Sequence, residues 1–544
     1  MKAQAFNPFL PLYEYVPDGE PHRFGDRIYL YGSHDREGGH TFCMEDYVVY
    51  SAPVSDLTDW RYEGVSYRAD QDPEYNKTPY LFAPDVVRGN DGRYYLYYGM
   101  GGEYGIGGYS GTIRVAVSDQ PGGPFSYLGY VRNADGTPMK KYICFDPAVI
   151  NDDGVIRLYY GTQYGYEEAQ DFRNREDLIR IETEMFGISR EELLSYTDSI
   201  NGANMLVLED DMLTVREEAR HILPYPVCRT DFAEHPFFEG SSIRKIGATY
   251  YFIYSSWLNH ELCYATSLYP DRGFKYGGTI VSNGDVGLNG RKAEDRVNMT
   301  GTTHGSIVCA DGQWYVFYHR LTHKSDYSRQ ACAEKITIAP DGSIAQVPVT
   351  SCGLNPGALR ATGTYPAVIA CQITNGHMPH GSNSVYSFAF PHVTHRDKSG
   401  EARTEDDRER FIAEIADGTR IGYKYFSFPG PVQIGVEVRF ETEHTRPIFN
   451  GPLRIDERCE ESLHLESDRV TGTPGITADE PYLEVFTDET GSAIGSIPLS
   501  SAKSEDPFAW IICRETFDMP SGDYPLFFVY HGKESLQMKT VVFG

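Results

Sequence analysis

Five short tyrosine-rich strands, each opened by a glycine, recur along the first two-thirds of this 544-residue chain. They are Gly25–Ser33, Gly92–Gly99, Gly154–Gly161, Gly247–Ser255 and Gly312–His319. One ionisable side chain precedes each glycine by seven or eight residues, and these are Asp18, Asp85, Asp146, Glu239 and His304. A repeat that places an ionisable group at the same point of every unit predicts a radial fold in which these groups converge on one axis.

The spacing of the repeats predicts the kind of radial fold. Successive repeat glycines are 67, 62, 93 and 65 residues apart, which is longer than one hairpin requires. Further strand patterns lie between them, at Tyr47–Ala52, Thr112–Val117 and Glu261–Ser267. Each unit therefore resembles a four-stranded blade, and residues 1–350 are predicted to form a five-bladed β-propeller.

The long third interval and the end of the blade pattern divide the rest of the chain. The excess residues predict a partly helical insertion near 165–220, because Ser189 to Glu192 has the spacing of a helix capping box. Such an insertion walls a pocket or makes a contact in a homo-oligomer. Residues 351–410 are expected to be a connecting segment. Strand alternation over 411–544 predicts a β-sandwich of jelly-roll type, which makes the whole chain all-β.

Composition excludes several classes of partner. The 49 basic and 77 acidic residues give a net charge of −28, so neither nucleic acid nor a membrane is an expected partner. The ten cysteines are scattered without a CxxC spacing, which favours reduced thiols and a cytoplasmic location. No phosphate-binding glycine-rich loop is found, so no organic cofactor is expected.

The converging groups themselves suggest a reaction. Three aspartates, a glutamate and a histidine around one axis cannot all keep their ordinary pKa values, because like charges raise the pKa of at least one carboxyl. A sugar hydrolase needs this arrangement: one ionised carboxylate takes a proton from water, and one protonated carboxyl donates a proton to the leaving oxygen.

Five motifs in order make the first domain resemble glycoside hydrolase family 43, the propeller enzymes related to β-xylosidases, α-L-arabinofuranosidases and arabinanases. The matching stretches are Val16-Pro17-Asp18, Phe82-Ala83-Pro84-Asp85, Phe145-Asp146-Pro147-Ala148, Phe238-Glu239-Gly240 and Thr303-His304-Gly305-Ser306. The resemblance covers roughly residues 7–350. The second domain resembles a family 6 carbohydrate-binding module through Gly422–Phe428 and the closing LFFVYHG stretch.

The resemblance implies a role for each catalytic candidate. Asp18 matches the general base, Glu239 the general acid, and Asp146 the aspartate that raises the pKa of the acid and orients it. The family inverts configuration, so the carboxyls of Asp18 and Glu239 should stand about 6.5–9.5 Å apart. His304 matches a histidine beside a structural calcium ion or a water cluster, and Arg320 matches an arginine that reaches the substrate.

Other residues are candidates for substrate binding. Phe82 and Phe145 belong to the motifs. Phe82 replaces a tryptophan common in the family, so the resemblance does not fix the identity of the sugar. His34, Asp35 and Trp257 flank repeat strands and line the pocket under this hypothesis, with turn and packing roles as the alternative. Asp85 is expected to be a buried, hydrogen-bonded blade residue.

The combined prediction is an inverting exo-glycosidase. It would remove terminal α-L-arabinofuranosyl or β-D-xylosyl residues from plant-derived oligosaccharides. A β-galactofuranosidase or another exo-glycosidase of the same family is the nearest alternative, and a non-catalytic carbohydrate-binding propeller is the alternative from another class. Phosphorolysis would need a cationic phosphate cradle, and the sequence does not indicate one.

Overall fold

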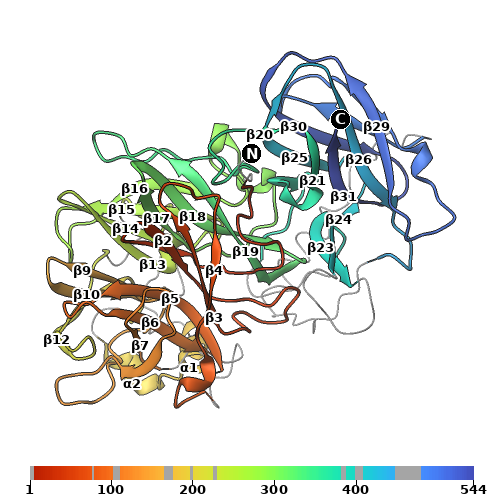
Figure 1. Ribbon diagram of the computed structural model, residues 1–544. Helices are drawn as coiled ribbons and strands as arrows, with labels where there is room; N and C mark the ends of the chain where they lie inside the picture. The colour runs from red at the N-terminus through yellow and green to blue at the C-terminus, as the bar shows by residue number, and fades with distance from the viewer. Residues whose placement is uncertain are drawn as a thin grey trace.

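The computed structural model describes residues 5–75, 79–101, 111–163, 176–196, 200–224, 230–381, 388–397, 408–446 and 480–544. Figure 1 shows two β-rich bodies side by side, with the propeller at the lower left and a sandwich of C-terminal strands at the upper right. The start of the chain lies where the two meet.

The first body is a ring of five sheets, which confirms the predicted propeller. Blade 1 is β1 (Glu20–Phe24), β2 (Arg27–Tyr31), β3 (Tyr47–Pro53) and β4 (Arg61–Tyr67). Blade 2 is β5 (Tyr80–Arg88), β6 (Tyr94–Gly101), β7 (Arg114–Ser118) and β8 (Ser126–Tyr130). Blade 3 is β9 (Ala148–Asp152), β10 (Val155–Tyr160), β11 (Asn204–Leu208) and β12 (Val215–His221). Blade 4 is β13 (Phe237–Ile246), β14 (Thr249–Ser256), β15 (Glu261–Ser267) and β16 (Lys275–Ser282). Blade 5 is β17 (Ser306–Ala310), β18 (Gln313–Thr322) and β19 (Ser325–Ile336).

The glycine-led repeats are the second strands of the blades, β2, β6, β10, β14 and β18. Each repeat glycine turns the chain from the first strand into the second with a positive φ: 66° at Gly25, 86° at Gly92, 91° at Gly154, 61° at Gly247 and 82° at Gly312. Glycine adopts this left-handed conformation without steric cost, which explains its recurrence. The first strands β1, β5, β9, β13 and β17 form the hub.

Two contacts close the ring. Gly19 and Gly305 form a parallel bridge between the entries of blades 1 and 5. The N-terminal segment runs along β19, where Phe9 N donates to the Ala331 carbonyl at 3.3 Å and the Asn7 side chain bonds the backbone of Ala333. Residues more than 300 positions apart therefore complete the same blade.

The insertion contains the predicted helical part, α1 (Glu176–Phe186) and α2 (Arg190–Ser195). Ser189 caps α2 and accepts a hydrogen bond from Glu192 N at 3.1 Å. Phe186 and Leu193 pack with Ile143 and Phe145, next to Asp146. The insertion therefore packs against the wall of the hub. Residues 164–175 and 197–199 of the insertion lie outside the described residues.

The second body is a β-sandwich of two six-stranded sheets. One sheet contains β20 (Leu359–Arg360), β22 (Gln372–Thr374), β25 (Arg420–Phe428), β27 (Tyr482–Phe486), β28 (Gly495–Pro498) and β30 (Gly522–His531). The other contains β21 (Gly363–Pro366), β23 (His392–Asp397), β24 (Arg408–Ile415), β26 (Val432–Phe440), β29 (Ile511–Phe517) and β31 (Leu536–Phe543). Strands β20 to β23 lie within 351–410, so this segment is part of the sandwich and not only a connector.

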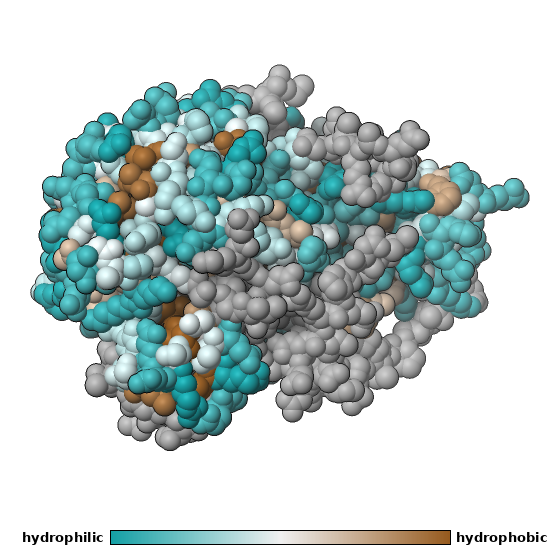
Figure 2. Space-filling model, turned by 90° about the horizontal axis from the view of Figure 1, so that it is seen from below, coloured by the Kyte–Doolittle hydropathy of each residue, from teal (hydrophilic) through white to brown (hydrophobic). Residues whose placement is uncertain are grey.

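The surface agrees with the acidic composition. Figure 2 shows a mostly hydrophilic face on which apolar side chains form small, separate patches. Among the described helices, none is both long and apolar enough to cross a membrane.

Candidate active site

The hub brings four of the predicted site residues together. Asp18 precedes β1, Asp146 precedes β9, Glu239 lies in β13 and His304 precedes β17. His304 Nδ1 is 3.8 Å from Asp18 Oδ1 and 3.9 Å from Asp146 Oδ2. Gly240 N, next to Glu239, donates to Asp146 Oδ2 at 2.9 Å. The entries of blades 1, 3, 4 and 5 therefore supply one cluster.

The backbone at the entries of these blades adopts positive φ angles, which are often found at functional sites. Asp18 has a φ of 57° and Asp146 a φ of 43°, and Gly240 has a φ of 73°. Non-glycine residues seldom adopt this left-handed conformation, and when they do they are often found at functional sites. The register of β13 also shifts on both sides of Glu239. Such bulges redirect side chains.

Asp18 has the electrostatics of a base. Burial alone would raise the pKa of Asp18, but the positive charge of the Arg329 guanidinium outweighs burial and lowers this pKa below its ordinary value. Arg329 Nη1 donates to Asp18 Oδ1 at 2.9 Å. Burial lowers the pKa of His319 to about 3, so this histidine is neutral and Arg329 supplies the positive charge. Asp18 is therefore ionised at neutral pH.

Glu239 has the opposite character. Burial, followed by the charge of Asp18, raises the pKa of Glu239 to about 8, although Arg329 opposes this. Burial and the charges of Glu239 and Asp18 also raise the pKa of Asp146. The Glu239 side chain is still partly exposed. The hub thus places a protonated carboxyl that can reach a ligand beside an ionised carboxylate.

Arg329 is a site residue that sequence reasoning missed, and Asp35 holds it. Arg329 Nε donates to Asp35 Oδ2 at 2.8 Å and Nη2 donates to Asp35 Oδ1 at 3.0 Å. Asp35 is fully buried beneath this fork, so it positions the guanidinium. Bidentate pairing fixes the orientation of the arginine plane as well as its charge. Phe42 covers the same group, with its ring centroid 4.7 Å from Arg329 Cζ.

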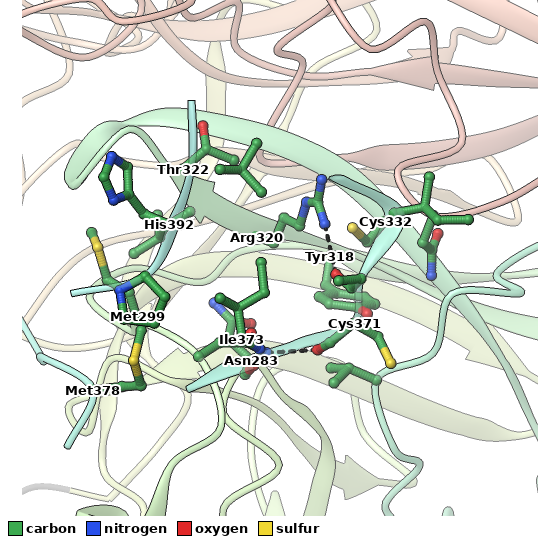
Figure 3. A pocket seen from close by; sticks show the side chains of 18 of the residues that line it. Asn283, Met299, Tyr318, Arg320, Thr322, Cys332, Cys371, Ile373, Met378 and His392 are labelled. Atoms are coloured by element: carbon green, nitrogen blue, oxygen red, sulfur yellow. Dashed lines mark hydrogen bonds between the residues drawn. The ribbon is translucent and has the colours of Figure 1, made fainter. Parts of the chain in front are cut away.

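Arg320, expected to reach the substrate, lies on the other side of its strand. Its guanidinium donates to the carbonyls of Val368 at 2.6 Å and Ala370 at 3.0 Å. Figure 3 shows Arg320 lining a cavity of about 50 Å³ between blade 5 and the sandwich. Adjacent residues of a strand point to opposite sides, so His319 faces the hub while Arg320 faces the second domain. Arg329 pairs across β18–β19 with Leu321, on the hub side.

The aromatic candidates surround the hub at different places. Phe82 is buried with its ring 6.1 Å from that of Phe145, which in turn lies 6.5 Å from Phe186 of α1. Trp257 stands edge-on to Phe238, the neighbour of Glu239, at 4.7 Å. Trp257 also lines an open hollow of about 820 Å³ at blade 4.

His34 has partners outside the carboxylate cluster. Its Nδ1 lies 2.7 Å from the Asp46 carbonyl and its Nε2 lies 3.4 Å from Glu14 Oε2. This side chain braces the loop between β2 and β3. A direct contact with substrate stays a prediction.

A second acidic group lies deeper in the hub. Asp85 Oδ1 is 2.5 Å from His22 Nε2 and accepts from Val86 N, while Oδ2 accepts from Val149 N of blade 3 at 2.7 Å. Glu20, also in this layer, accepts from Arg244 Nη2 at 2.7 Å. Asp85 thus joins blades 1, 2 and 3, as expected for a structural residue.

The calcium ion expected beside His304 stays a prediction. His304 Nε2 is buried and has no hydrogen-bond partner in the part of the chain that the structure describes, so it can take one more contact. Calcium prefers six to eight oxygen ligands. The nearest carboxylates, Asp18 and Asp146, lie on the Nδ1 side, and Arg329 already neutralises Asp18. Such an ion would take one nitrogen from His304, and waters would complete its shell.

The geometry and charge of the hub define a glycoside hydrolase site: two carboxyls with opposed protonation, held at the axis of a five-bladed propeller. The chain belongs to the glycosyl hydrolases family 43, whose sequence profile matches residues 7–344. This confirms the family resemblance seen in the motifs.

Individual proteins are similar to the chain over different lengths. A xylosidase/arabinosidase of Thermoclostridium stercorarium is 39% identical over 556 residues, covering 99% of each chain. Xylosidase/arabinosidase 43A of Humicola insolens is 32% identical and covers 61% of this chain and 96% of its own. Among solved structures, a GH43_1 enzyme from Xanthomonas citri complexed with xylose is 27% identical, with a TM-score of 0.47 over 62% of this chain and 91% of that chain.

Proposed function

We propose that this protein is an inverting exo-glycosidase that removes terminal β-D-xylosyl or α-L-arabinofuranosyl residues from plant-derived oligosaccharides. The observation that carries the proposal is the opposed protonation of Asp18 and Glu239 at one hub. The sugar is suggested by the xylosidase/arabinosidase of Thermoclostridium stercorarium, which is similar over the full chain.

In this mechanism each group has one task. The Asp18 carboxylate takes a proton from a water as that water attacks the anomeric carbon, and the glycosidic bond breaks on the opposite side. The Glu239 carboxyl gives its proton to the departing oxygen. Asp146 orients the acid through its hydrogen bond from Gly240 N, while burial and the charge of Asp18 keep the pKa of Glu239 high. Arg329 keeps Asp18 ionised and oriented.

The test is a product analysis. Wild-type enzyme is incubated with xylobiose and with a short arabino-oligosaccharide, and the anomer released is followed by NMR in the first minutes. We expect a monosaccharide with inverted configuration. Retention of configuration would contradict the roles of Asp18 and Glu239. Activity on galactofuranosides alone would favour the β-galactofuranosidase alternative.

We also propose that the enzyme works in the cytoplasm on imported oligosaccharides. The eight cysteines within the described ranges are all unpaired, as is usual in a reducing compartment. Cell fractionation with an activity assay tests this location.

A further inference from the structure

The sandwich domain contacts the loop that holds Arg329, the partner of Asp18. Residues 32–46 between β2 and β3, called here the β2–β3 loop, contain Asp35, Phe42 and Cys43. Cys43 N donates to Asp35 Oδ1 at 2.9 Å, which orients the carboxylate that grips Arg329. The position of Arg329 therefore depends on the conformation of this loop.

Glu37 anchors the same loop, two residues after Asp35. Its side chain is 1% exposed. On the propeller side it accepts from Tyr15 OH at 3.2 Å. The next residue, Gly38, donates its N–H to Ser328 Oγ at 2.9 Å, and Ser328 immediately precedes Arg329. The loop is thus attached both to Arg329, through Asp35, and to the residue before it, through Gly38.

The arginines that neutralise Glu37 come from the sandwich, whereas the propeller offers the imidazole of His323, whose Nε2 lies 3.8 Å from Glu37 Oε1 and whose pKa burial lowers. Arg410 Nε donates to Glu37 Oε1 at 2.9 Å and Nη2 to Oε2 at 2.7 Å, while Arg408 Nη1 donates to Oε2 at 2.5 Å. His395, which pairs with Arg410 across β23–β24, lies 3.3 Å from Glu37 Oε1. A buried carboxylate deprived of such partners would carry a large desolvation cost.

We propose that Arg410, with Arg408, is a positioning residue for catalysis: it fixes Glu37 and the β2–β3 loop, and through Asp35 it holds Arg329 against Asp18. The sandwich is then part of the catalytic apparatus and not only an attached module. The proposal deepens the proposed function, because it assumes that Asp18 is the base whose charge Arg329 maintains.

The first test compares Arg410→Ala and Glu37→Gln with wild type in the pH dependence of kcat/KM on an aryl xyloside. An opposite charge within about 4–6 Å lowers a carboxyl pKa by roughly 1–3 units. A loosened Arg329 should therefore move the acid limb of the profile upward by about half a pH unit to one pH unit. The acid limb of Arg410→Lys should lie between those of wild type and Arg410→Ala. An unchanged acid limb in both variants overturns the proposal, even if thermal stability falls.

The matched control is Arg514→Ala, which removes an exposed arginine from β29 of the same domain. It should leave the acid limb and the rate unchanged. An equal shift in this control would show that any disturbance of the sandwich alters the site, which also overturns the specific role of Arg410.

A second readout needs no substrate. Hydrogen exchange of residues 32–46 should rise in Arg410→Ala and Glu37→Gln and stay at the wild-type level in Arg514→Ala. If no pentoside is cleaved but exchange changes as expected, the proposed substrate is wrong, and the positioning role of Arg410 and Glu37 is supported. If the enzyme cleaves pentosides and exchange in the loop does not change, the positioning role of Arg410 is wrong, and the proposed glycosidase activity is supported.

Discussion

Asp85 and Asp146 occupy the same point of the repeat in neighbouring blades, yet their surroundings are opposite. Asp85 is contacted by His22 and accepts two backbone N–H groups. Its pKa is lowered because His22, the charge of Arg244 and the Val149 N–H together outweigh burial. Asp146 accepts from Gly240 N and faces two acidic neighbours, and burial together with those neighbours raises its pKa. The position in the repeat brings a carboxyl to the hub. The hydrogen-bond donors and charges around that carboxyl then determine whether its role is structural or catalytic.

The largest effect should come from the base. Asp18→Asn removes the group that accepts the proton from water, and general base catalysis contributes up to about 10⁴-fold. We expect kcat to fall by about 10⁴ on aryl pentosides and on oligosaccharides alike. Steady-state kinetics measure this, and residual activity above about one per cent would remove Asp18 from the role of base.

The acid should give a smaller and substrate-dependent effect. Glu239→Gln should lower kcat about 10³-fold on xylobiose, whose leaving oxygen needs a proton. On a nitrophenyl pentoside the loss should be about tenfold, because that leaving group departs without much protonation. A loss of equal size on both substrates would contradict the assignment.

Asp85→Asn should change stability and leave the chemistry intact. The amide cannot satisfy His22 and both N–H donors, and a buried donor without a partner costs about 1–3 kcal/mol. We expect the free energy of unfolding to fall by about 3 kcal/mol in denaturant titration, with kcat/KM within about threefold of wild type. A loss of activity as large as that of Asp146→Asn would break the comparison between the two aspartates.

The pH profile of the rate should have an acid limb set by the pKa of Asp18 and an alkaline limb set by the pKa of Glu239. Asp18 works ionised and its pKa is lowered, so the rate should rise with pH through a limb below the ordinary range of about 3.9. Glu239 works protonated, so the rate should fall about tenfold per pH unit above a pKa of about 8. Burial and the charges of Glu239 and Asp18 raise the pKa of Asp146, so this carboxyl is neutral when Glu239 titrates and Asp146→Asn should leave the alkaline limb in place. A downward shift of the alkaline limb would show that an ionised Asp146 raises the pKa of Glu239.

Trp257→Ala should have the smallest effect. The ring stands beside Phe238, the neighbour of Glu239, and lines the hollow at blade 4. We expect this hollow to hold the leaving-group part of an oligosaccharide. An aromatic contact contributes about 1 kcal/mol, so KM for an oligosaccharide should rise about fivefold. KM for a nitrophenyl pentoside should not change, and an equal rise for both would place Trp257 beside the terminal sugar.

Much of this site could be predicted because the repeat fixes where side chains converge. Each glycine turn and the ionisable residue before it lie within eight residues of one another in the sequence. The sequence alone therefore indicates the four hub residues, Asp18, Asp146, Glu239 and His304. Arg329 could not, since its role depends on which side of β19 faces the hub and on Asp35, 294 residues away. The family resemblance predicts that Arg320 reaches the substrate, but strand alternation turns this side chain toward the sandwich.

The sandwich was predicted less completely for a related reason. Its long strands, such as β26, show a clear alternation of apolar residues. Strands β20 to β22 have only two to four residues each, and glycine and proline occur among them. Pairing with distant long strands, and not local sequence preference, makes them part of the sheets.

The attachment of the N-terminal segment to β19 has a consequence for synthesis of the protein. Asn7 finds its partners Ala333, Glu334 and Thr350 only 326 to 343 residues later in the chain. During translation Asn7 must wait without these partners until nearly two-thirds of the polypeptide has emerged from the ribosome. Contacts of such long sequence separation slow folding. A ribosome stalled within blade 4 should therefore carry a nascent chain whose beginning is still open to proteases.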